Sequence, residues 1–170
     1  MQYQVTASIG LRRQLDTDKN SVSLCRLMNE VQAHPTVLSR SRHVRAFISL
    51  GYSVALGNHD FDELAGEGEE CIQPITVGVE LNDFIAKSAC IKKYTNKRIA
   101  HIDAGHLNEL PTNNDWEIAI DCLEQLVIRY TILLRRESHI SLVPTFVYDW
   151  RAIFYQPWIA NPFAANNDDQ

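Results

Sequence analysis

The chain has 170 residues and a formal net charge of −5, with 45% hydrophobic and 22% charged residues. This length predicts one domain with a core that needs no covalent staple, and the composition excludes a disordered or collagen-like protein. The acidic balance argues against a dedicated binder of double-stranded DNA. No apolar run is long enough to span a membrane, and no signal-peptide pattern opens the sequence, so we expect a cytoplasmic protein.

The first predicted elements lie before Pro35. Residues 1–20 are polar and rich in turn formers, and we expect an irregular N-terminal segment there. Apolar residues at helical spacing then predict a helix over residues 21–34, with Ser21 as its N-cap. Pro35 ends this helix, because the residue before a proline is driven out of the α region.

The next segment predicts a helix followed by a loop. Apolar spacing favours a helix over residues 39–56, weakened by Gly51. Residues 57–73 contain three glycines and many acids, which indicates a surface loop with one short helix at residues 61–65.

The loop begins with the tetrapeptide GNHD at residues 57–60. It is similar to a metal-binding element of calcineurin-like metallophosphoesterases. One loop cannot hold two metal ions, however, and the other ligand motifs of that family are missing from the sequence. We therefore favour a turn in which Asn58 or Asp60 caps the short helix.

The second half predicts two long helices, over residues 75–103 and 115–138, with Asn113 or Asn114 as the second N-cap. The residues between them predict a turn, so the helices form a long antiparallel hairpin in an all-α bundle. The core stripe of the first helix consists of Leu81, Phe84, Ser88, Ile91, Thr95, Ile99 and Ile102.

The C-terminal part is aromatic and proline-punctuated, with residues 141–148 as the best strand candidate and residues 164–170 as a polar tail. Its aromatic side chains would either stack on RNA bases or pack back on the bundle, and we favour packing. They are Trp150, Phe154, Tyr155 and Trp158.

Two features bear on metal binding. His101, Asp103 and His106 have a spacing that could hold a metal ion, but Gly105 breaks the helix between them. We favour histidines that suit the negative end of a helix dipole, and predict no metal site. The four cysteines form no CxxC pair, so we expect reduced thiols.

The stretch KKYTNKRIAHID at residues 92–103 displays cations beside a histidine. At about 100° per residue, Lys97 and Arg98 flank His101, and Tyr94 shares this stripe, away from the predicted core. A histidine beside cations has a lowered pKa, and the group suits phosphate binding and proton transfer. The alternative is a solvated basic turn at a helix end.

Within this stretch, NKRIAHID (residues 96–103) resembles the motif of the HEPN superfamily, nearest to the pattern RNKxxAHxD of bacterial abortive-infection proteins. The segment DWRAIFYQPWI at residues 149–159 resembles the ending of that branch, and SLCRL at residues 23–27 resembles its opening helix. The likeness covers most of residues 20–160.

The resemblance implies a single HEPN-like helical domain over residues 21–163, with the aromatic segment packed back, and a homodimer whose motif helices face each other. It also implies a cofactor-free, metal-independent endoribonuclease of a phage-defence or toxin–antitoxin system, restrained by an antitoxin or other partner protein. By position, His101 is the general acid/base and Asn96 the polar helper. Lys97 or Arg98 would stabilise the phosphate, Asp103 and Tyr94 would support the site, and Lys92, Lys93 and Lys97 would bind RNA.

One position departs from the family pattern. Thr95 stands where the motif arginine is expected, and a threonine cannot neutralise a charged transition state. The second hypothesis is therefore an inactive HEPN-like module that binds RNA, a nucleotide or a partner protein.

Overall fold

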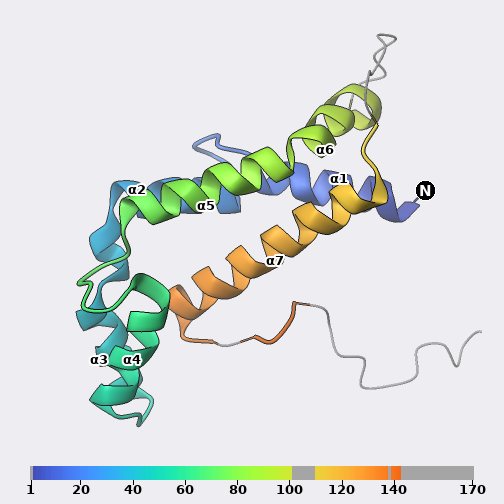
Figure 1. The fold of residues 1–170 in the computed structure, drawn as a ribbon. Helices are drawn as coiled ribbons and strands as arrows, with labels where there is room; N and C mark the ends of the chain where they lie inside the picture. The colour runs from blue at the N-terminus through green and yellow to red at the C-terminus, as the bar shows by residue number, and fades with distance from the viewer. Residues whose placement is uncertain (1, 101–109, 138, 143–170) are drawn as a thin grey trace, which may run out of the picture. The chain divides into compact units, whose positions relative to one another are not determined.

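The computed structural model describes residues 2–100, 110–137 and 139–142 (Figure 1). Every regular element in this part of the chain is helical, and its one β feature is an isolated bridge between Ser39 and Cys71. The all-α prediction is confirmed. In chain order the elements are α1 (Gln2–Gln14), α2 (Leu24–Ala33), the 3₁₀ turn η1 (Pro35–Leu38), α3 (Arg40–Ser49), α4 (Val54–Ala65), α5 (Pro74–Lys87), α6 (Ala89–Tyr94), the π-helical turn η2 (Thr95–Ala100) and α7 (Asn113–Arg135).

The chain divides into two compact units, Met1–Ile140 and Ser141–Gln170. All the helices just named belong to the first unit. The predicted domain end at residue 163, the polar tail, the aromatic segment and most of the candidate strand lie outside the described residues. They stay predictions.

The N-terminal segment is helical, so the predicted irregular structure is wrong. Helix α1 contacts α6, η2 and α7, but much of its contact face is polar. Ser8 is fully buried, and its hydroxyl accepts a hydrogen bond from Trp116 Nε1 at 3.0 Å. A face of this kind gives little apolar periodicity, which is why the sequence pattern missed it. The available signal was Leu11 and Leu15, four residues apart and both buried.

The N-cap of helix α2 lies two residues later than predicted. Its N-cap is Ser23, whose side chain accepts the N–H of Arg26 at 3.1 Å. The hydroxyl of Ser21, the predicted cap, donates instead to the carbonyl of Asp18 at 2.8 Å. The helix ends before Pro35, as predicted.

Residues 39–73 differ most from the prediction. Helix α3 ends at Ser49, because Gly51 lies in the left-handed region at φ +87°. A second helix, α4, then follows its cap Ser53 and runs into the predicted loop as far as Ala65, so it contains the predicted short helix at residues 61–65. The GNHD tetrapeptide is therefore helical, and the predicted turn is wrong. Gly57 permits this packing, since a Cβ there would lie 3.1 Å from Phe47 Cβ on α3.

Over residues 75–100, the described part of the predicted range 75–103, the helix is present with two irregularities. It is interrupted at Ser88, and from Thr95 onward it becomes the π-helical turn η2. The predicted stripe is buried at Leu81, Phe84, Ser88, Ile91 and Thr95. Helix α5 contacts α2 and α7, and α6 contacts α1.

Helix α7 starts with a capping box, in which Thr112 accepts the N–H of Asp115 and the Asp115 carboxylate accepts the N–H of Thr112. The predicted caps, Asn113 and Asn114, lie just inside the helix. Helices α5 and α7 run antiparallel, because Glu80 bonds to Tyr130 while Asp83 contacts Cys122.

Candidate functional site

The described part of the predicted site lies on α6 and η2. Lys92, Lys93 and Tyr94 end α6, and Asn96, Lys97 and Arg98 belong to η2. The remaining predicted site residues, His101 and Asp103, lie outside the described residues, as does His106. π-Helical turns are rare and are often found at functional sites.

Thr95 belongs to the core. Its side chain is 1% exposed, and Oγ1 donates to the carbonyl of Ile91 at 2.7 Å. The carbonyl of Ser8 on α1 lies 3.5 Å from the same oxygen. Thr95 therefore packs η2 against α1, and its side chain does not face solvent. The prediction that Thr95 lies on the core stripe is confirmed.

Tyr94 also packs inward, against the core, so the prediction that it lies away from the core is wrong. Its half-buried ring meets Trp116 of α7 edge to face, with 6.1 Å between the ring centroids. Its ring thus joins α6 to α7. The expected support of His101 by Tyr94 stays a prediction.

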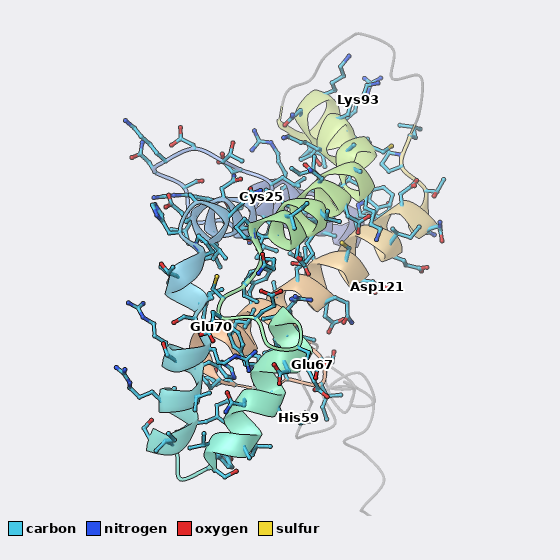
Figure 2. All side chains as sticks on the ribbon, turned by 60° about the vertical axis from the view of Figure 1, so that its left-hand side comes forward. Cys25, His59, Glu67, Glu70, Lys93 and Asp121 are labelled. Carbon is cyan, nitrogen blue, oxygen red and sulfur yellow. The ribbon has the colours of Figure 1, made fainter. Side chains whose placement is uncertain are left out.

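The opposite side of the helical run carries positive charge. Lys92, Lys93 and Arg98 are exposed, while Asn96 and Lys97 are half-buried. Lys93 extends outward at the end of α6 (Figure 2). Residues 91–98 therefore separate into a buried apolar side and a cationic side, in a chain whose net charge is −5.

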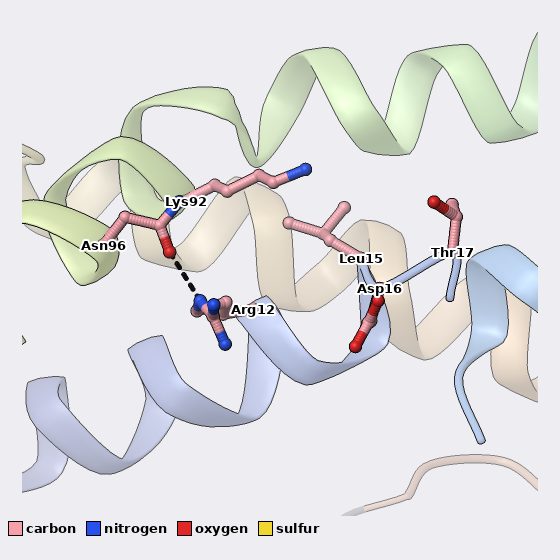
Figure 3. Close-up of a pocket in the computed structure, with 6 residues that line it drawn as sticks. All are labelled: Arg12, Leu15, Asp16, Thr17, Lys92 and Asn96. Atoms are coloured by element: carbon pink, nitrogen blue, oxygen red, sulfur yellow. Dashed lines mark hydrogen bonds between the residues drawn. The ribbon is translucent and has the colours of Figure 1, made fainter. Parts of the chain in front are cut away.

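A residue absent from the predicted site joins this cationic side. Arg12, in the last turn of α1, donates from Nε to Asn96 Oδ1 at 2.5 Å (Figure 3). The two residues are 84 positions apart. Sequence periodicity could not place them together, because the helix that carries Arg12 was not predicted.

Arg12 and Asn96 border a small cavity between α1 and α6–η2 (Figure 3). Its volume is about 140 Å³, and its walls consist of Arg12, Leu15, Asp16, Thr17, Lys92 and Asn96. Two cations, an amide and a hydroxyl can donate hydrogen bonds into this space. The arrangement suits a small anion.

Lys92 also influences the pKa of a buried thiol, Cys25. Burial raises the pKa of the Cys25 thiol to about 11, and the positive charge of Lys92 acts in the opposite direction. Cys25 is therefore a protonated, inert core residue at neutral pH.

The GNHD side chains bond to separate partners. Asn58 donates to the carbonyl of Val54 at 3.1 Å, and His59 pairs with Glu63 at 3.5 Å. Asp60 bonds to the buried His43 at 2.7 Å. Across the described ranges, no group of three or more His, Cys, Asp or Glu side chains is arranged to hold a metal ion.

Of the helices that the structure describes, none combines the length and apolarity required to cross a membrane.

Comparison of the chain with models of protein families, with curated proteins and with solved structures finds no match.

Proposed function

We propose that the chain is a HEPN-like, metal-independent endoribonuclease. The observation that supports this function is the two-sided character of residues 91–98, with the core on one side and Lys92, Lys93 and Arg98 exposed on the other. In an acidic chain, such a local group of cations suits the backbone of RNA. This cationic face immediately precedes His101, the residue to which the family resemblance assigns proton transfer.

The proposed reaction is cleavage of RNA through its own 2′-hydroxyl. The 2′-oxygen attacks the neighbouring phosphorus, and the bond from phosphorus to the 5′-oxygen breaks, which leaves a 2′,3′-cyclic phosphate and a 5′-hydroxyl. His101 removes the proton from the 2′-hydroxyl or returns one to the leaving 5′-oxygen. Asn96 and neighbouring cations stabilise the charge that develops on the phosphate.

The cellular setting follows from the same resemblance. The enzyme acts as a cytoplasmic homodimer in a phage-defence or toxin–antitoxin system, restrained by an antitoxin or other partner protein. Asp103 and Tyr94 support His101.

A second candidate function is a non-catalytic module that binds RNA, a nucleotide or a partner protein. The burial of Thr95 favours it, because a side chain bonded to Ile91 and Ser8 inside the core cannot replace the motif arginine. The two functions share the cationic face and differ in whether His101 transfers protons.

Cleavage in the absence of metal ions separates the two functions. We expect the purified protein to cut a pool of structured RNAs in excess EDTA, and His101→Ala to lose at least about a hundredfold in rate, the lower range for general acid–base catalysis. His59→Ala is the matched control, because His59 is an exposed histidine on α4, distant in sequence from the motif. Equal rates for the wild type and His101→Ala would contradict the proposal. Absence of cleavage by a folded wild type that binds RNA would favour the second function.

A further inference from the structure

The cavity between α1 and α6–η2 has the features of a phosphate site (Figure 3). Asn96 accepts from Arg12 Nε at 2.5 Å, and this bond fixes the plane of the guanidinium. The remaining N–H groups of an arginine lie on Nη1 and Nη2, a planar fork that matches two oxygens of a phosphate. Asn96 therefore orients Arg12 for an anion.

Lys92 supplies a second positive charge. Its side chain is exposed on α6 and extends along the cavity toward Leu15 (Figure 3). An ammonium group is a compact point charge with three donors, which complements the planar fork of an arginine. The cavity thus offers one directional cation and one adaptable cation.

One acid also lines the cavity. Asp16 Oδ1 accepts the backbone N–H of Asp18 at 3.0 Å, so one carboxylate oxygen is engaged in a local turn. Two cations and one carboxylate therefore line the cavity, and the net charge of its walls is positive. The C-terminal end of α1 carries the negative end of the helix dipole, and Arg12 and Arg13 in its last turn offset that partial charge.

The cavity has room for one phosphate group. Its volume is about 140 Å³, and it is open to solvent on one side. A sugar and base attached to that phosphate can therefore lie outside.

We propose that Arg12 and Lys92 bind one phosphodiester group of a single-stranded RNA in this cavity. The inference rests on the proposed function and deepens it, because it names the groups that bind the RNA backbone beside the motif. Arg12 reaches the motif from another helix and supplies a guanidinium that the buried Thr95 cannot. Asn96 acts as a positioning residue through its bond to Arg12 Nε.

The test uses a ligand with one phosphodiester that the protein cannot cut. Uridylyl-adenosine with a 2′-O-methyl group on the uridine has no 2′-hydroxyl at the reacting position. We expect millimolar binding to the full-length protein in an NMR titration. Arg12→Ala and Lys92→Ala should each weaken binding about tenfold, as expected for the loss of one charge-assisted contact.

Two exposed cations outside the cavity provide matched controls. Arg13 follows Arg12 in the last turn of α1, and Lys19 is an exposed lysine; neither lines the cavity. Arg13→Ala and Lys19→Ala remove the same kinds of charge, and we expect each to keep the affinity within twofold. Equal weakening by all four variants would mean general attraction to a basic surface and would overturn the proposal.

Two further measurements keep the outcome clear. If Arg12→Ala lowers the melting temperature by loosening α1 from η2, the comparison of Lys92→Ala with Lys19→Ala decides, because both lysines are exposed and only Lys92 lines the cavity. Inorganic phosphate is titrated in parallel. If phosphate binds and the dinucleotide does not, the cavity takes free phosphate and the RNA assignment is wrong.

Failure of this inference is distinguishable from failure of the proposed function. Dinucleotide binding that depends on Arg12, without RNA cleavage in EDTA, would support phosphodiester binding in the cavity and contradict the nuclease function. RNA cleavage that depends on His101 but is equal in Arg12→Ala and Arg13→Ala would support the nuclease function and contradict phosphodiester binding in the cavity.

Discussion

Thr95 illustrates how a single side chain sets the limits of a site. Its hydroxyl bonds to the carbonyl four residues earlier, and it is covered by α1 at Ser8. A long cationic side chain at this position would have to enter the core or displace α1. The arginine that borders the motif comes instead from α1, where Arg12 lies at the surface.

We expect Thr95→Arg, which introduces the arginine that the resemblance leads one to expect, to destabilise the fold without gain of cleavage. An unpaired buried charge costs about 3–5 kcal/mol, so the free energy of unfolding in urea should fall by several kcal/mol. Thr95→Val is the control. It removes one hydrogen bond at nearly constant volume and should cost about 1 kcal/mol. A Thr95→Arg variant as stable as the wild type would mean that α1 leaves room for this side chain.

Among the helices, those with apolar buried faces could be predicted from the sequence. The stripe from Leu81 to Thr95 follows helical spacing and is buried. The same holds for the core residues of α7, which are Trp116, Ala119, Leu126, Tyr130 and Leu133. Helix α1 was missed because its contacts include buried Ser8. Helix α4 was predicted only over residues 61–65, because glycine and acidic residues are typical of loops, whereas here Gly57 permits close packing against α3.

Two of the helical glycines, Gly10 and Gly57, should respond in opposite ways to alanine. Nothing lies within 4 Å of a Cβ at Gly10 of α1, so Gly10→Ala should stabilise the protein by about 1 kcal/mol through helix propensity. A Cβ at Gly57 would lie 3.1 Å from Phe47 Cβ and 3.2 Å from Val44 Cα. Gly57→Ala should therefore lower the melting temperature as α3 and α4 separate. A rise for both variants would contradict the close packing of α3 and α4.

For the molecule as a whole, the fold class followed from the sequence but the complete site did not. Residues 92–98 were predicted to separate into core and cationic sides, because helical spacing within one segment suffices for that. The bond between Arg12 and Asn96 joins residues 84 positions apart, and no local pattern encodes it. The ion pairs that connect other helices, such as Arg129 with Glu80, are equally nonlocal.

The pair formed by the buried His43 and the half-buried Asp60 should make the stability of the whole fold depend on pH. Burial lowers the pKa of His43 below its usual 6.5, and the positive charge of Arg136 acts in the same direction, while Asp60 opposes both. The unfolded chain therefore takes up the proton first. The stabilising contribution is complete above pH 6.5 and is lost as the pH falls through the folded pKa, by about 1.4 kcal/mol for each unit between the two values.

Urea unfolding at several pH values between 7.5 and 5 measures this effect. His43→Gln cannot titrate, so its stability should fall less than that of the wild type over this range. The exposed His59 offers the control, and His59→Gln should keep the wild-type dependence. If the free energy of unfolding depended on pH in the same way for His43→Gln and the wild type, His43 would not be the cause of the pH dependence.

The β-bridge between Ser39 and Cys71 brings together the two ends of the segment that forms α3 and α4. Arg40 N–H bonds to the carbonyl of Glu70 at 2.9 Å, and Ile72 N–H bonds to that of Leu38 at 3.3 Å. The polypeptide thus leaves α2 and η1, forms the α3–α4 pair, and returns to its point of departure before α5. A segment whose two ends already meet costs little loop-closure entropy to lengthen or shorten. The exposed turns within residues 39–71 are therefore the natural place for insertions in this architecture, since the helices on either side remain joined at the same point.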